Sequence, residues 1–138
     1  MALFEEAVKD TPNDFILIDY APHDWLFSKC NYVVHHGGAG TVGASLLAGK
    51  PMIICSTLGD QPFWGKKMTE MKLGWHVPMK ELTTEKLVTG LMNVSLKEVV
   101  ENLKGIQEKI RKEDGISGLV NSIIENLESG NSYVPKTV

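Results

Sequence analysis

The residues with the clearest chemical potential form a histidine- and glycine-rich stretch between two apolar segments. It reads His-His-Gly-Gly-Ala-Gly-Thr and spans 35–41. A turn of this kind from strand to helix leaves the first backbone N–H groups of the helix unpaired, at the positive end of the helix dipole. A phosphate would satisfy these groups, and glycines would let it approach the backbone. The pattern therefore predicts a diphosphate site, to which Thr41 adds a hydroxyl and a neighbouring histidine adds an N–H donor.

Two other interpretations of the glycines stay open on the residues alone. Glycine-rich turns also occur simply where the chain makes a tight corner. In addition, the run from Gly38 to Gly43 matches G-x-G-x-x-G, the dinucleotide fingerprint. A dinucleotide site wants an acidic residue at the tip of the next strand, where Cys55 and Ser56 stand, so this alternative is weaker. No Gly-Lys-Ser/Thr follows the glycines, which excludes a P-loop.

Composition indicates one globular domain in a reducing compartment. The 138 residues are 43% apolar, and 14 basic against 17 acidic residues give a net charge of -3. This balance offers no general attraction to nucleic acid, and no partner of that kind is expected. Cys30 and Cys55 are far apart and lack metal-ligand spacing, so we expect free thiols, no metal site and a cytoplasmic location. No apolar run approaches the roughly 20 residues that cross a bilayer, and the N-terminus lacks the basic region of a signal peptide.

Apolar runs and amphipathic stretches alternate through most of the chain. Such alternation predicts a parallel sheet with helices on both faces, followed by a C-terminal third that is only helical. We expect strands at 15–18, 32–34, 52–55 and 75–78. We expect helices before Thr11, within 21–27, and over 39–48, 64–72, 85–92, 96–112 and 118–127, with a loop over 56–63.

Capping residues set the expected helix ends and the domain boundary. Gly49 ends the helix after the glycine-rich turn, Thr83 and Thr84 begin a later one, and Ser95 caps the next. Residues 1–128 form a single domain in this interpretation, and 129–138 form a polar tail.

Four segments in fixed order resemble the C-terminal half of family 1 glycosyltransferases, and most closely the sterol 3-β-glucosyltransferases. The segments are APHDWLF, VVHHGGAGT, AGKPMII and GDQPFWGKKM, and the resemblance covers about 15–91. It implies a GT-B fold, in which two Rossmann-like domains face each other across a cleft and the C-terminal one binds the nucleotide sugar. The implied donor is UDP-glucose, used as a substrate, with no separate cofactor.

The resemblance also assigns roles to residues of this sequence. It implies diphosphate contacts from His36, Gly38, Ala39, Gly40 and Thr41, sugar contacts from Asp60 and Gln61, and uridine contacts from Tyr20, Ala21 and His23. Plant members carry a ribose-binding glutamate where Ala44 stands, so no ribose contact is assigned.

Several of these side chains have plainer alternatives. His35 and His76 fit local structural roles, Asp60 could cap the following helix, and His23 could be a turn residue. Trp64 is expected to pack beneath the sugar loop rather than touch the sugar.

The implied activity is inverting glucosyl transfer to a sterol or other lipid-like acceptor. The resemblance places the acceptor pocket and the catalytic base in an N-terminal domain, so no catalytic residue is assigned and the chain alone is expected to be inactive. Two alternatives remain: a natural subunit that needs a second chain, and a non-catalytic nucleotide-binding module. Exposed apolar surface where the absent part would dock makes self-association plausible. Any contact with membranes is expected through that absent part.

Overall fold

A three-stranded parallel sheet lies at the centre of the chain, in a computed structural model that describes residues 14–129. Its strands are β1 (Val33–His35), β2 (Met52–Ser56) and β3 (Gly74–Pro78), in the order β1-β2-β3. In the register, His35 lies opposite Ile54, and Ser56 lies opposite Pro78. The carboxyl ends of the strands therefore meet at one edge, where parallel sheets bind ligands. The helices are α2 (His23–Lys29), α3 (Ala39–Ala48), α4 (Gln61–Glu70), the 3-10 helix η2 (Met79–Glu81), α5 (Thr84–Val94), α6 (Lys97–Lys112) and α7 (Gly115–Glu128).

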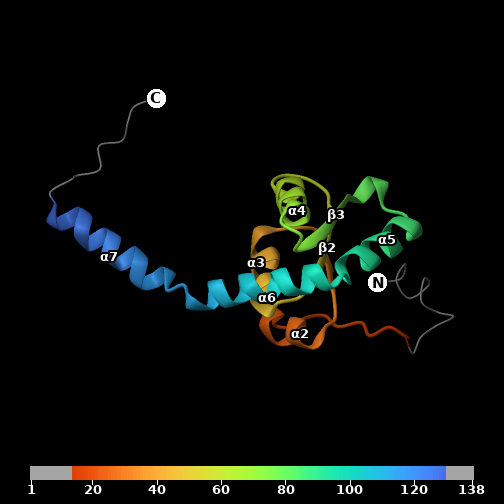
Figure 1. Ribbon diagram of the computed structural model, residues 1–138, viewed down its shortest axis with the longest axis horizontal. Coiled ribbons are helices and arrows are strands. Elements are labelled where there is room, and N and C mark those ends of the chain that lie inside the picture. The colour runs from red at the N-terminus through yellow and green to blue at the C-terminus, as the bar shows by residue number, and fades with distance from the viewer. Residues whose placement is uncertain (1–13, 130–138) are drawn as a thin grey trace, which may run out of the picture.

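Helices cover both faces of the sheet, as the alternation predicted (Figure 1). Every residue of β2 is buried, so successive side chains of this central strand enter different cores. On one face Met52 and Ile54 pack with residues of α3, α4 and α6. On the other face Ile53 and Cys55 pack with Val77 and with residues of α5. The helix α7 extends away from this body and buries none of its residues (Figure 1).

Local signals account for the ends of the helix that follows the glycine-rich turn. The helix α3 begins at Ala39 and ends at Ala48, as predicted. Gly49 closes it with a φ of 64°, in the left-handed region that glycine adopts without strain. The side chain of Gln107 on α6 then donates a hydrogen bond to the carbonyl of Leu47 at 2.7 Å, which ties the long helix to this end of α3.

The strand predicted at 15–18 is not formed. These four apolar side chains are 48% to 88% exposed, and their backbone is irregular. A strand of this kind needs a neighbour to which it can bond, and within residues 14–129 the sheet consists of β1, β2 and β3 alone. The prediction of a buried strand at 15–18 is therefore wrong for the described residues.

Three helix starts also differ from the predictions. The helix α4 begins at Gln61 rather than at Trp64, because Pro62 suits a first turn and does not prolong the loop. The cap of α6 is Leu96, while Ser95 ends α5 and donates its hydroxyl to the carbonyl of Leu91. The helix α7 begins at Gly115, because Asp114 accepts a hydrogen bond from the amide of Ser117. The helix expected before Thr11 and the tail beyond Ser129 lie outside the described residues.

Candidate functional site

The amino end of α3 presents free backbone donors at the carboxyl edge of the sheet. Gly38 is the residue before the helix, and it has no side chain that could cap the first amides. A Cβ added at Gly40 would meet no atom within 4 Å, so the space beside the first turn is open. A Cβ at Gly38 would lie 2.7 Å from Nε2 of His36, which places the imidazole directly beside the start of the helix. The geometry is that of an anion site with backbone amides, a hydroxyl at Thr41 and one exposed imidazole.

A close backbone approach brings this turn against the loop that carries Asp60 and Gln61. Gly37 has a φ of 95°, and a Cβ there would lie 2.6 Å from Cγ2 of Ile54 and 3.3 Å from the carbonyl oxygen of Gln61. Only glycine fits a position that is both left-handed and this crowded. Gly37 thus joins the two motifs that the sequence placed more than twenty residues apart.

Both side chains of the Asp60–Gln61 pair are held by neighbours. Trp64, which lies one turn further along on α4, donates its indole N–H to Oδ2 of Asp60 at 2.8 Å. Oε1 of Gln61 accepts hydrogen bonds from the amide of Thr57 at 2.8 Å and its hydroxyl at 2.7 Å, and from the amide of Leu58 at 3.2 Å. Asp60 precedes α4 without making a side-chain cap, so the capping alternative is not what the structure contains. The pair offers one carboxylate oxygen and the amide N–H groups of Gln61, which together can accept from and donate to hydroxyls.

Three histidines lie near one another at the end of β1. Burial, and to a lesser extent the positive charges that His36 and His23 can carry, lower the pKa of His35 to about 4. Nδ1 of His35 accepts a hydrogen bond from the amide of Gly37 at 3.1 Å. His35 therefore stays neutral at physiological pH and braces the turn, which agrees with the local role considered for it. The side chain of His36 is exposed.

The residues predicted to hold uridine lie on the approach to α2. Tyr20 is 85% exposed, Ala21 is half-buried, and His23 is the first residue of α2. The ring of His23 stacks on Phe27, with centroids 4.7 Å apart and planes at 13°. His23 is thus near the turn, because its charge affects His35, but its ring already has a packing partner.

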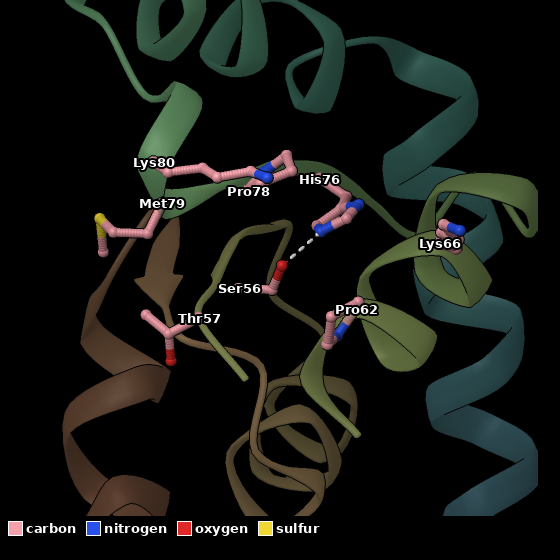
Figure 2. Close-up of a pocket in the computed structure, with 8 residues that line it drawn as sticks. All are labelled: Ser56, Thr57, Pro62, Lys66, His76, Pro78, Met79 and Lys80. Carbon is pink, nitrogen blue, oxygen red and sulfur yellow. Dashed lines mark hydrogen bonds between the residues drawn. The ribbon is translucent and has the colours of Figure 1, made fainter. Parts of the chain in front are cut away.

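A cavity lies at the same edge of the sheet, beside the glycine-rich turn and its neighbours, and was not predicted from the sequence. It has a volume of about 650 Å³ and opens at the carboxyl ends of β2 and β3 (Figure 2). Most of the residues that line it were expected in the loop over 56–63, the helix over 64–72 and the strand over 75–78, and none of them was assigned a functional role. The signal that could have found them is positional, since Ser56 and Pro78 end adjacent parallel strands. The lining residues are Ser56, Thr57, Pro62, Lys66, His76, Pro78, Met79 and Lys80.

Neither a membrane span nor a metal cluster occurs in the part of the chain that the structure describes. Over 14–129 no helix has the length and apolar character to cross a bilayer. Within the same range no three histidine, cysteine, aspartate or glutamate side chains gather closely enough to hold a metal ion.

Comparison with known families decides what kind of domain carries this site. Residues 2–116 match the profile of the erythromycin biosynthesis protein CIII-like C-terminal domain. The chain belongs to this family. It is therefore the C-terminal domain of a family 1 glycosyltransferase, as the four segments implied.

Relatives of this C-terminal domain include plant and fungal sterol glucosyltransferases. The chain is 37% identical over 125 residues to sterol 3-beta-glucosyltransferase UGT80A2 of Arabidopsis thaliana, which covers 89% of this chain and 20% of that protein. It is 37% identical over 124 residues to sterol 3-beta-glucosyltransferase of Saccharomyces cerevisiae strain YJM789, at 89% and 10% coverage. The domain thus spans a fifth or less of the length of these relatives.

Solved glycosyltransferases share its fold. The glycosyltransferase VinC, solved in complex with dTDP, aligns with a TM-score of 0.74 at 22% identity over 88% of this chain and 32% of VinC. The spinosyn forosaminyltransferase SpnP aligns with a TM-score of 0.71 at 18% identity, over 80% of this chain and 31% of SpnP. The Rossmann-like parallel sheet of a GT-B C-terminal domain is therefore confirmed.

Proposed function

We propose that this domain binds UDP-glucose and forms the donor half of an inverting glucosyltransferase that acts on a sterol or another lipid-like acceptor. The observation that carries the proposal is the uncapped amino end of α3, with open space beside Gly40 and the imidazole of His36 next to Gly38. Unpaired amides and a helix dipole favour a diphosphate at this point. The relatives' name as sterol glucosyltransferases and the dTDP bound by VinC support a nucleoside diphosphate sugar as the ligand.

The proposed roles follow from position. His36 and the amides of Gly38, Ala39, Gly40 and Thr41 bind the diphosphate. The Asp60–Gln61 pair, held against the same turn through Gly37, contacts the hydroxyls of the sugar. Tyr20 and Ala21 precede α2 and His23 begins it, and these three residues are proposed to hold the uracil.

The chemistry proposed for this half concerns the departing nucleotide. As the glycosidic bond breaks, negative charge grows on the diphosphate, and fixed donors stabilise it without reorganising. The acceptor hydroxyl must lose its proton to a base. His36 belongs to the donor side, and His35 is half-buried and bonded to the amide of Gly37, so we propose that the base comes from an N-terminal acceptor domain or a partner chain. Without it the domain binds the donor but does not transfer the sugar.

Two alternatives to this proposal remain. The chain could be a natural subunit of a two-chain enzyme, or a non-catalytic module that binds nucleotides. We further propose a cytoplasmic location, supported by Cys30 and Cys55, which are both free thiols. Mixing the domain with an acceptor domain from a relative, and then following sugar transfer, separates a half-enzyme from a module that only binds.

Isothermal titration tests the donor site directly. We expect UDP and UDP-glucose to bind, and His36→Ala to weaken UDP about tenfold while changing uridine little, since uridine lacks the diphosphate. Asp60→Asn should weaken UDP-glucose more than UDP, because Asp60 is proposed to contact only the sugar. The asparagine side chain can still accept the bond from Trp64, so the loop should keep its conformation. Equal losses for UDP and uridine in His36→Ala would contradict the diphosphate role.

A further inference from the structure

The cavity at the ends of β2 and β3 borders the proposed donor site, because Thr57 lines it and bonds to Oε1 of Gln61, but a different set of residues lines it. None of the residues assigned to UDP-glucose is among those that line it. Its volume of about 650 Å³ is in the range of small-molecule sites, roughly 300–1,000 Å³. Its walls come from three elements, namely the end of β2, the first two turns of α4 and the segment from β3 into η2 (Figure 2).

Two ammonium groups border this cavity without a counter-ion. Lys66 lies on α4 and Lys80 on η2, and neither makes an ion pair with any residue in 14–129. The nearest acidic side chain on η2, Glu81, is already paired with Lys86 at 3.2 Å. A smaller cavity of about 260 Å³ adjoins across Lys66 and His76, and its carboxylate, Glu70, pairs with Lys67 at 3.9 Å. The positive charge that faces the larger cavity is therefore unbalanced in a chain whose net charge is negative.

The floor between the two lysines is polar and fixed. Nε2 of His76 and the hydroxyl of the buried Ser56 are hydrogen-bonded at 2.8 Å (Figure 2). The imidazole of His76 packs against α4 at Gly65, where an added Cβ would lie 2.6 Å from its Cγ. Burial and then the charge of Lys66 lower the pKa of His76, with Glu81 acting in the opposite sense, so this ring contributes a neutral hydrogen-bonding group.

The remaining wall is apolar. Pro62, Pro78 and Met79 face the cavity, and Met79 is 47% exposed at its mouth. A sugar carries no negative charge for the two unpaired ammonium groups, and a bare inorganic ion has no apolar surface for the proline and methionine side chains. Neither ligand therefore uses the whole cavity. It fits a ligand that carries a negative head and a hydrocarbon body.

We propose that this cavity binds an amphipathic anion, that is, a carboxylate or phosphate monoester on an alkyl body. The anionic head pairs with Lys66 and Lys80. The alkyl part packs on Pro62, Pro78 and Met79. Free fatty acids and phospholipid-derived alkyl phosphates both supply this chemistry.

Titration of the full chain with four probes distinguishes the head from the body. The probes are decanoate, decyl phosphate, decanol and inorganic phosphate, each kept below the concentration at which it forms micelles. We expect decanoate and decyl phosphate to bind, and decanol and inorganic phosphate to bind at least tenfold more weakly. A stronger response to decanoate assigns the site to fatty acids, and a stronger response to decyl phosphate assigns it to phosphate esters. Equal binding of decanol would overturn the proposal, since the lysines would then play no part.

Matched lysine variants locate the site. Lys66→Ala and Lys80→Ala should each weaken decanoate about tenfold, whereas Lys67→Ala, the next residue on α4 but outside this cavity, should not. All three side chains are exposed, so thermal unfolding should stay unchanged and confirm that each variant is folded. Decanoate binding that ignores Lys66 and Lys80 overturns the proposal. His36→Ala should retain decanoate binding, and saturating UDP should not displace the probe; displacement would mean one shared site and would overturn the claim of a separate one.

Discussion

The backbone amide of Gly37 donates a hydrogen bond to Nδ1 of His35, at 3.1 Å, across the turn that follows β1. This bond requires Nδ1 to be unprotonated, so the proton of the neutral ring sits on Nε2. Within the described residues Nε2 is buried and has no hydrogen-bond partner. Protonating His35 would place a charge in this desolvated environment beside His36 and His23, which lowers its pKa to about 4. It would also remove the acceptor that braces the turn.

The first prediction concerns the pH dependence of stability. An unfolded chain protonates His35 near pH 6.5, and the folded chain does so only near pH 4. Because the unfolded state then binds more protons, the free energy of unfolding should fall as the pH drops through this window, by up to roughly 3 kcal/mol from this group. Urea unfolding measured between pH 4 and 7 tests this. His35→Gln should flatten the curve, leaving the contribution of His76 in the same direction. The exposed His36→Gln should change the slope less, because burial contributes more than the charge of His36 to the low pKa of His35. An unchanged slope in His35→Gln would show that other groups are responsible.

The second prediction separates ligand contact from folding at the amino end of α3. Neither Gly40 nor Gly43 has any atom within 4 Å of an added Cβ, so Gly40→Ala and Gly43→Ala should fold with stability equal to or up to about 1 kcal/mol above that of the parent. Only Gly40 lies beside the first amides of the helix, where the diphosphate is proposed to sit. Gly40→Ala should therefore weaken UDP about tenfold in titration calorimetry, and Gly43→Ala should not. Identical affinities for the two variants would move the nucleotide away from this turn.

The third prediction concerns the packing of His76 on α4. Gly65 has the imidazole of His76 directly against it, so Gly65→Ala should destabilise the fold by about 1–3 kcal/mol despite the better helix propensity of alanine. The control is Gly105→Ala on α6, where an added Cβ meets nothing within 4 Å and stability should hold or rise. Chemical denaturation of both variants is the measurement. A neutral Gly65→Ala would mean that the ring moves aside at no cost.

The fourth prediction concerns the terminal helix α7. Its apolar residues are exposed, with Ile116 80% exposed and Leu127 75%, and they recur at the spacing of a helix-pairing stripe through Val120 and Ile123. We expect the isolated chain to self-associate through this stripe in sedimentation equilibrium, and Val120→Gln with Ile123→Gln to shift it toward monomer. The thermal midpoint of the body should not fall, because α7 buries none of its residues. A lower midpoint in dilute solution would indicate that α7 packs on the body after all.

The central elements could be predicted from the sequence because the residues that specify them lie within or next to each element. Ala39–Ala48 ends at Gly49, whose left-handed φ favours glycine, and the first four residues of β2 form an unbroken apolar run. The strand expected at 15–18 was wrong for a different reason, since strand formation depends on a neighbour and an apolar run does not specify one.

The candidate site shows the same division. The glycine-rich turn that we propose binds the diphosphate was visible as a motif, but its approach to Gln61 through Gly37 could be seen only in the fold. The cavity between Lys66 and Lys80 had no motif, because its members are ordinary residues that become a set only when β2 and β3 end side by side.

The sheet order leaves one side of β1 without a strand beside it among residues 14–129, and Val34 on that strand is 53% exposed. Main-chain amides and carbonyls attract extended backbone of almost any composition. When this domain is produced alone, the open edge of β1 can therefore pair with a strand of another molecule. Val34→Lys is the simplest substitution to reduce aggregation during purification.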